Sequence, residues 1–244
     1  MKACIFIDGE NLRHSLCDLF KPTEFDPTDY LPKTARWEEF FDFLATRCYS
    51  STRLRTYWYV VEAVEFWPWK LPNEDEKLLR VISKHPPYAE ELKRAGQKVE
   101  TARRLSTTIQ DERTRFEKRF HGWHIIQNGI ATQHDATEFR RAGTIRYDLF
   151  KKELGKEKAV DVMLAVDMLE LSPIYEVAII LSGDGDYVPA VQAVKDKGKR
   201  VINVSFEARN GELLPGGARK LNQITDKVLV VKYEQMRDFM LQLK

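Results

Sequence analysis

Polar side chains follow two short hydrophobic runs in the sequence, at residues 3–7 and 177–181. These polar residues are Asp8 and Asn11 after the first run, and Ser182, Asp184 and Asp186 after the second. Carboxylate oxygens without histidine or cysteine are the ligands that Mg²⁺ and Mn²⁺ prefer. A divalent ion held in this way can activate water and stabilise the charge that develops at phosphorus.

A third hydrophobic segment begins with Lys158 and Asp161 and is predicted to be a helix. A lysine in the first turn of a helix opposes the helix dipole, so Lys158 requires an acidic neighbour. Asp167 lies six residues after Asp161, which is about 240° around the helix and ~9 Å along its axis. We therefore expect Asp167 to have a structural or supporting role.

The order of the elements predicts where these residues meet. Strands alternate with helices along the chain, which indicates an α/β fold, a three-layer α/β/α Rossmann-like arrangement around a parallel sheet. Right-handed crossovers place the carboxyl ends of parallel strands at one edge, where ligands bind. A helix that leads into a parallel strand begins at that same edge. Asp8, Asp161 and Asp184 are therefore expected to converge there.

Each acid also has a plainer interpretation. Asp8 could belong to a simple turn with Gly9, and Asp184 and Asp186 could cap a turn or a helix. Asp161 could be a surface acid favoured by the helix dipole. However, acids at two strand ends and one helix start form a combination that favours a site. Converging carboxylates repel by a few kcal/mol per pair at an effective dielectric constant of ~20, so they require a cation or raised pKa values.

Three sequence blocks carry a family resemblance: residues 7–11, residues 158–167 and residues 181–189. Together, and in this order, they resemble the NYN domain, a PIN-like nuclease family that includes the LabA-like bacterial proteins. The resemblance implies a PIN-like fold and cleavage of RNA phosphodiester bonds that depends on Mg²⁺ or Mn²⁺.

The resemblance also implies roles for individual residues. The catalytic and metal-binding acids would be Asp8, Asp161, Asp184 and Asp186. Asn11 would support the first acid or contact the substrate, Lys158 would lie beside the acids, and Ser182 would shape the loop after its strand.

Basic residues are dense between residues 140 and 158, directly before the third block. They are Arg140, Arg141, Arg146, Lys151, Lys152, Lys156 and Lys158. This density predicts a loop that binds the substrate's phosphates, with Arg146 and Lys152 among its contacts. Trp67 and Trp69 could stack on bases, but we expect them to pack in the core.

The 244 residues are expected to form a single NYN/PIN-like domain spanning residues 1–244, with a helical insertion at about 62–120 and a basic loop at about 129–157. Within the insertion we predict helices at 74–84 and 88–120. A strand is expected at 123–126, and irregular structure is expected over 129–157. The helical insertion could serve as a homodimer interface.

Composition excludes several classes of protein. Lys and Arg number 39 and Asp and Glu 37, so the net charge of +2 does not itself indicate nucleic-acid binding. Cys4, Cys17 and Cys48 form no Cys-x-x-Cys pair, which is typical of the reducing cytosol. The first hydrophobic run is too short for a secretory signal, and no run approaches 18 apolar residues. We expect a cytoplasmic protein that does not bind membranes.

The sequence supports three hypotheses about function. The first is a metal-dependent endoribonuclease, a hydrolase that uses Mg²⁺ or Mn²⁺ and acts on single-stranded RNA. The alternative is a PIN-like module that binds RNA or protein without cleaving it. A second alternative is a metal-dependent phosphatase, because the same chemistry hydrolyses small phosphate esters.

Overall fold

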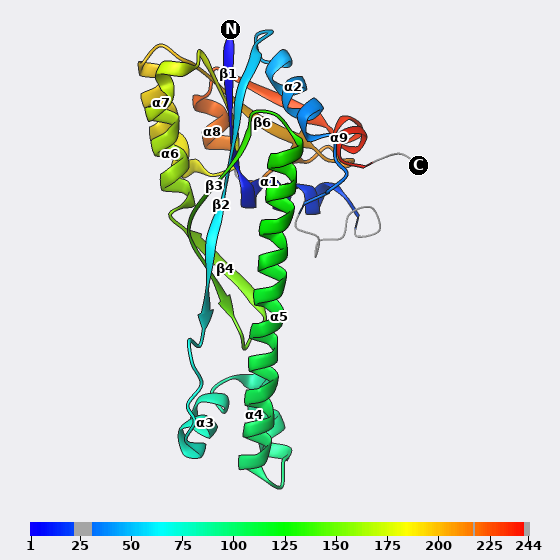
Figure 1. The fold of residues 1–244 in the computed structure, drawn as a ribbon, viewed down its shortest axis with the longest axis vertical. Coiled ribbons are helices and arrows are strands. Elements are labelled where there is room, and N and C mark those ends of the chain that lie inside the picture. Colours follow the sequence, from blue (N-terminus) through cyan, green and yellow to red (C-terminus); the bar gives the residue numbers. More distant parts are fainter. Residues whose placement is uncertain (22–30, 217, 242–244) are drawn as a thin grey trace. The chain divides into compact units, whose positions relative to one another are not determined.

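The computed structural model describes residues 1–21, 31–216 and 218–241, and these residues group into two compact units (Figure 1). The larger unit consists of Met1–Val60, Trp123–Ala142 and Ala159–Lys244. The smaller unit consists of Val61–Gly122 and Gly143–Lys158. In the part of the chain that is described, no helix is both long enough and apolar enough to cross a membrane.

The structure is a mixed α/β fold with a mostly parallel sheet, as the sequence predicts. Over the described residues the strand order is β4-β3-β2-β1-β5-β6-β7, and β8 also pairs with β6. The pairs β1–β2, β1–β5, β5–β6 and β6–β8 are parallel, whereas β3–β4 and β6–β7 are antiparallel. The larger unit contains β1 (Lys2–Asp8), the first part of β2 (Thr52–Trp67), β5 (Val177–Leu181), β6 (Arg200–Glu207), β7 (Leu213–Leu214) and β8 (Lys227–Lys232).

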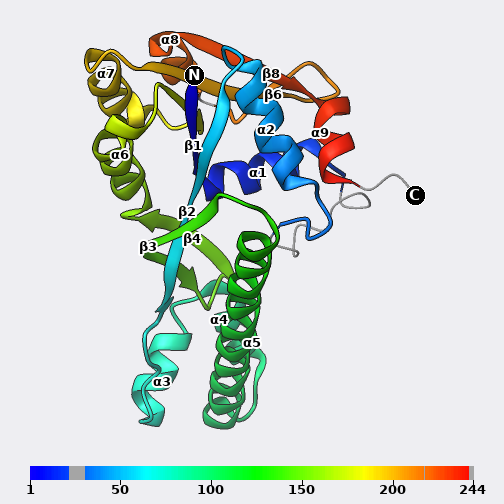
Figure 2. The same ribbon diagram turned by 45° about the horizontal axis from the view of Figure 1, so that its top comes forward.

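Helices cover both sides of the central strands, which explains their continuous hydrophobic sequences. Figures 1 and 2 show α6 and α7 on one side of β1, and α1, α2 and α9 on the other. The side chains of Ala3–Ile7 in β1 are accordingly 0% exposed. The helices of this unit are α1 (Gly9–Leu19), α2 (Trp37–Arg47), α6 (Val160–Glu170), α7 (Val188–Asp196), α8 (Arg219–Ile224) and α9 (Tyr233–Met240), with short 3₁₀ helices η1 (Ser172–Ile174) and η2 (Gly185–Tyr187).

An aromatic cluster joins α2 to the sheet in the larger unit. The rings of Trp37 and Trp58 meet edge to face with their centroids 4.9 Å apart, and both side chains are fully buried. On β3 the ring of Phe139 stacks on Trp58 at 4.8 Å. Aromatic pairs of this kind stabilise the core beyond the effect of the area that they bury.

The smaller unit is a helical layer with a β-hairpin. Its elements are α3 (Asp75–Ile82), α4 (Pro86–Arg94), the first part of α5 (Lys98–Gln133), the end of β3 (Thr137–Asp148) and β4 (Glu153–Lys158). The rings of Phe116 and Tyr147 stack at 3.9 Å, and Phe66 meets both of them edge on. The buried Tyr147 hydroxyl donates a hydrogen bond to Glu112 at 2.8 Å, so this unit has its own core.

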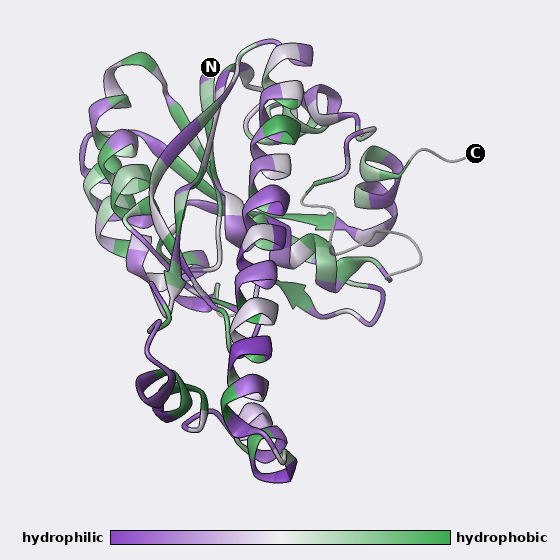
Figure 3. Ribbon diagram, turned by 60° about the horizontal axis from the view of Figure 1, so that its bottom comes forward, coloured by the Kyte–Doolittle hydropathy of each residue, from purple (hydrophilic) through white to green (hydrophobic). Residues whose placement is uncertain are grey.

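The helix expected at 88–120 is two helices in the structure, since α4 ends at Arg94 and α5 begins at Lys98, and the strand expected at 123–126 is wrong because this segment belongs to α5. Trp123, Gln127 and Ile130 are buried at spacings of four and three residues, which is a helical pattern. Aromatic and β-branched residues at 123–126 resemble a strand, but β-propensity depends strongly on context. Figure 3 shows hydrophilic and hydrophobic residues mixed along α5, because the buried positions recur mostly every three or four residues among charged ones.

The irregular basic loop expected over 129–157 is also corrected by the structure. This stretch contains the end of α5 and the antiparallel hairpin β3–β4. Ile145 and Tyr147 are buried on one face of β3, whereas Arg146 between them is exposed. This alternation is typical of a strand with one solvated face, but the many charged residues around it obscure the pattern.

Trp67 and Trp69 do not pack in the core, contrary to expectation. They are 48% and 71% exposed. The guanidinium of Arg146 lies 4.6 Å from the centre of the Trp67 ring, and that of Arg113 lies 5.8 Å from the centre of the Trp69 ring. Both tryptophans therefore form cation–π contacts at the surface of the smaller unit.

Candidate functional site

The ends of β1 and β5 form the base of the candidate site in the larger unit. The two strands are parallel neighbours with Ile7 opposite Leu181, so the next residues, Asp8 and Ser182, lie side by side. The hydroxyl of Ser182 donates a hydrogen bond to Asp8 Oδ2 at 3.0 Å. Both side chains are buried, and the strand register therefore places a carboxylate at the sheet edge that the sequence predicts.

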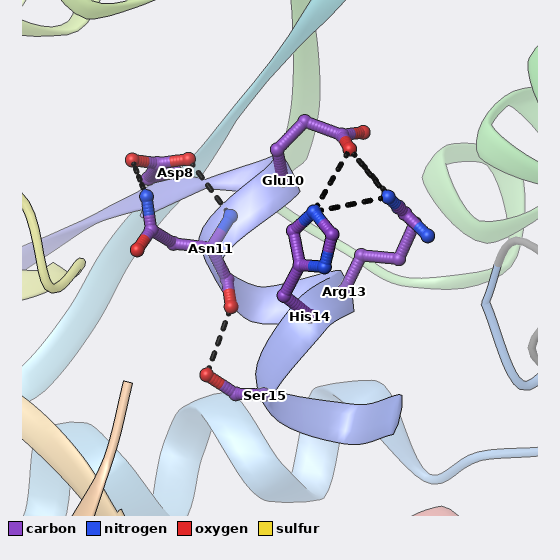
Figure 4. A network of polar contacts seen from close by, with 6 residues as sticks. All are labelled: Asp8, Glu10, Asn11, Arg13, His14 and Ser15. Carbon is purple, nitrogen blue, oxygen red and sulfur yellow. Dashed lines mark hydrogen bonds and ion pairs between the residues drawn. The ribbon is translucent and has the colours of Figure 1, made fainter. Parts of the chain in front are cut away.

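Asp8 also caps helix α1, as Figure 4 shows. Its Oδ1 accepts a hydrogen bond from the backbone N–H of Asn11 at 3.0 Å, and its Oδ2 accepts one from the Asn11 side-chain amide. The Asn11 Oδ1 accepts a hydrogen bond from the Gly183 N–H at 3.2 Å. One asparagine therefore ties the acid of β1 to the loop after β5. These contacts match the supporting role that the resemblance implies for Asn11.

The turn between β1 and α1 requires a glycine. A Cβ atom at Gly9 would lie 2.5 Å from the carbonyl oxygen of Tyr59 and 2.8 Å from Cγ1 of Val60. Backbone atoms cannot yield to such a clash, so any side chain here would displace Asp8 from the sheet edge.

Asp161 reaches Asp8 from the first turn of α6. The carboxylates of Asp8 and Asp161 have oxygens within 4.8 Å of each other. The hydroxyl of Tyr187 donates a hydrogen bond to Asp161 Oδ1 at 2.8 Å, and it lies 3.4 Å from Asp8 Oδ2. Tyr187 is therefore a bridging residue that the sequence analysis missed. Its position in the third block is a signal, but spacing alone does not indicate which way its ring turns.

Asp184 and Asp186 lie in the loop after β5. The Ser182 hydroxyl accepts a hydrogen bond from the Asp184 N–H at 3.0 Å, and Asp184 Oδ1 accepts one from the Asp186 N–H at 2.8 Å. Asp184 thus caps the short helix η2, which is the plainer role considered above. Among the described residues, no hydrogen bond or ion pair involves Asp184 Oδ2 or the Asp186 carboxylate, and Asp186 is exposed.

The pKa values show that these acids influence one another. Burial raises the pKa of Asp161, the Tyr187 hydrogen bond opposes this, and the charges of Asp184 and Asp186 raise it further. Burial likewise raises the pKa of Asp8 to about 6, against the hydrogen bond from the Asn11 backbone, while the Asp161 charge adds to the increase. Converging, partly desolvated carboxylates of this kind gain stability from a divalent cation. All the atoms that these acids offer as ligands are carboxylate oxygens, which Mg²⁺ and Mn²⁺ prefer.

The remaining residues from the sequence analysis belong to other elements. Asp167 forms an ion pair with Arg140, which supports the structural role expected for it. In the smaller unit, Lys158 ends β4, Lys152 lies in the turn of the hairpin, and Arg146 projects from β3 over Trp67. A role for these three residues in substrate binding stays a prediction.

A pocket of about 660 Å³ opens beside the acids in the larger unit. It is lined by Asn11, Gly183, Asp184, Gly185, Asp186, Gly216, Arg219 and Lys220. The sequence analysis missed its two basic residues, because it treats 211–222 only as a short helix. Their position after strand β6, whose carboxyl end lies at the same sheet edge, is the signal that could have identified them.

The raised pKa of Asp8 predicts a specific pH dependence of stability. Between its unfolded pKa of about 4 and its folded pKa of about 6, the folded protein holds a proton that the unfolded chain releases. The free energy of unfolding therefore falls as pH rises through this window, by about 3 kcal/mol. Asp8→Asn does not titrate and retains a good helix cap. Urea denaturation in EDTA at pH 4 and pH 7 should show the parent losing this stability relative to the variant. A constant difference would contradict the prediction.

Comparisons with known proteins provide the family. The family model for the NYN domain matches residues 88–216, just over half of the chain, and this span includes Asp161, Ser182, Asp184 and Asp186. A protein of unknown function from Vibrio parahaemolyticus has a similar solved structure, with 15% sequence identity, a TM-score of 0.44, and coverage of 94% of this chain and 92% of its own. No curated protein matches the chain. The match to the family model shows that the chain belongs to the NYN domain family.

Proposed function

We propose that the chain is a metal-dependent endoribonuclease that hydrolyses phosphodiester bonds of single-stranded RNA. The observation that supports this proposal most directly is the pair formed by Asp8 and Asp161, whose carboxylate oxygens lie within 4.8 Å of each other at the sheet edge. The NYN domain belongs to a nuclease superfamily, which supports this assignment. We also propose the three-layer PIN-like arrangement, because helices flank β1 on both sides.

The metal in this proposal is Mg²⁺ or Mn²⁺, with Asp8, Asp161, Asp184 and Asp186 as its ligands. An ion bound there would supply Lewis-acid activation of water and would neutralise the charge that builds up at phosphorus. Asp8 Oδ1 accepts one hydrogen bond from protein, so a lone pair remains for a ligand. The Asp161 oxygen that accepts from Tyr187 is fixed in orientation.

The other residues of the proposed site position these acids. Asn11 and Ser182 direct hydrogen bonds to Asp8, and Tyr187 directs its hydroxyl to Asp161. Because three distinct chain segments contribute, small changes in the loop after β5 would alter the separation of the carboxylates. We expect such changes to lower the rate of hydrolysis, since catalytic geometry tolerates little displacement.

Divalent ions should stabilise the protein if these acids bind them. At a free concentration of 100 times Kd, a ligand of the folded state adds about 2.7 kcal/mol. For a chain of this size this raises Tm by ~5–10 °C. Differential scanning calorimetry with Mn²⁺ or Mg²⁺ should show this increase for the parent.

Asp161→Asn should lose most of the metal-dependent increase in Tm and should raise Tm in EDTA, because it removes one of two neighbouring negative charges. Asp238→Asn, an exposed acid on α9 paired with Arg237, is the matched control and should respond as the parent does. A parent Tm that is insensitive to millimolar metal, or an equal increase in Asp161→Asn, would count against the metal site.

Cleavage of RNA tests the activity itself. With Mn²⁺, the parent should cut a labelled single-stranded RNA internally and leave 5′-phosphate and 3′-hydroxyl ends, since water attacks phosphorus and the 3′-oxygen leaves. Asp161→Asn and Asp184→Asn should reduce the rate by at least about 100-fold, equivalent to ~3 kcal/mol of the barrier. Asp238→Asn should retain the parent rate.

Product ends and metal dependence separate this activity from its alternatives. A contaminating ribonuclease that uses the 2′-hydroxyl leaves a cyclic phosphate and needs no metal. Cutting that persists equally in Asp161→Asn would refute the proposal. Turnover of a chromogenic phosphate monoester without RNA cleavage would instead favour the phosphatase hypothesis. RNA binding without either activity would favour the non-catalytic module.

A further inference from the structure

We infer that the larger unit holds one nucleotide of a single-stranded nucleic acid next to the acids, with Arg219 and Lys220 on its phosphate and Gln223 at the edge of its base. This inference rests on the proposed function, because it assigns the substrate contacts of that site. Two adjoining hollows carry it: the pocket already described and a second groove beside α8.

The first hollow separates charges of opposite sign. Asp184 and Asp186 line it together with Arg219 and Lys220. Within the described residues, neither basic side chain forms an ion pair or a hydrogen bond. Most other arginines of the described chain are paired with an acid, as Arg140 is with Asp167. Two exposed cations without partners, facing acids that they do not neutralise, are suited to bind an anion.

The walls of this pocket leave room for a phosphate. Three of its lining residues are glycines, which have no side chain to obstruct an approaching ligand. A Cβ atom at Gly216 would meet nothing within 4 Å, whereas one at Gly185 would contact Cδ of Lys220 at 3.5 Å. The stem of Lys220 therefore lies against Gly185, and both residues line the pocket.

The second hollow continues from the first. It has a volume of about 450 Å³ and shares Gly185 and Lys220 with the pocket. Its other lining residues are Val188, Pro189, Gln223 and Ile224. Helix α8 packs against η2 and α7, so the groove lies between two neighbouring helical segments.

Helical spacing explains the composition of the groove. Lys220, Gln223 and Ile224 lie at i, i+3 and i+4, and therefore share one face of α8. On the opposite wall Gly185, Val188 and Pro189 have the same spacing. The result is an apolar slot with one amide, which can contact the face of a planar ring and hydrogen-bond to its edge.

The order of groups along the two hollows favours a nucleotide within a strand. The acids come first, then the basic pair Arg219 and Lys220, and then the apolar slot with the amide of Gln223. A small phosphate ester would use only the first hollow. A strand whose scissile phosphate lies at the acids would place the next phosphate near Lys220 and the attached base in the slot.

The test is binding of fluorescein-labelled single-stranded RNA of 12 nucleotides in EDTA, measured by fluorescence anisotropy across a range of KCl. Arg219→Ala and Lys220→Ala should each weaken binding about 5- to 10-fold. Each should also make the dependence of log K on log[salt] shallower by about 0.7, the value for one phosphate contact with a single strand. Arg237→Ala, which removes a half-buried arginine of α9 that is paired with Asp238, is the matched control and should bind as the parent does.

Gln223→Ala gives a second, independent measurement. It should leave the salt dependence unchanged and reduce the difference in affinity between oligo(U) and oligo(A), because the amide contacts the base and not the backbone. The side chains of Arg219, Lys220 and Gln223 are exposed, so melting curves of their variants should match that of the parent.

Binding in EDTA needs no catalysis, so this inference and the proposed function can fail separately. Equal affinities and salt slopes for the parent, Arg219→Ala and Lys220→Ala would overturn the inference, even if the parent cleaves RNA. A parent that does not bind the RNA would also overturn it. A parent that binds through Lys220 but never cleaves would support the subsite and refute the nuclease.

Discussion

The burial of Asp8 beside a second carboxylate is the constraint on which the site depends. The strand register places Asp8 at the end of β1, where burial raises its pKa to about 6 and Asp161 adds to the increase. The fold tolerates this because Asn11 and Ser182 donate hydrogen bonds to the charged form. A hydrophobic residue at position 8 would relieve the cost of burial, but it would leave the Asn11 and Ser182 donors without their acceptor. In the proposed function, a bound cation would offset the cost of burying the acid.

The topology explains why most of the acids could be predicted from sequence. Continuous apolar runs identify β1 and β5 as strands with two covered faces, and a parallel sheet brings their ends together. Asp8, Asp161 and Asp184 follow from that rule alone. Tyr187 does not, because the direction of its ring depends on how η2 packs. Nor do Arg219 and Lys220, since their place depends on the path of the chain after β6.

The elements between residues 61 and 158 were harder to predict for a different physical reason. Each of these elements buries only a few side chains per helical turn or per strand. Charged residues therefore dominate the hydrophobicity pattern of their sequence. In α5 one of the buried positions, between Ile109 and Phe116, is itself the charged residue Glu112. In β3 the buried residues Ile145 and Tyr147 lie on either side of the exposed Arg146, and the half-buried Arg140 and Arg141 precede them. Periodicity predicts structure best where one face of an element is fully buried.

The separation of charge beside the acids distinguishes this site from a structural ion-pair network. In such a network each cation lies within reach of an acid, as Arg140 does with Asp167, and the pair excludes further ligands. Here, among the residues that the structure describes, the basic residues and the acids line one pocket without pairing. A cation at the acids and an anion at the bases can then bind together, and each would strengthen the attraction for the other. In the proposed function, the divalent ion and a phosphate of the substrate would be these two ligands.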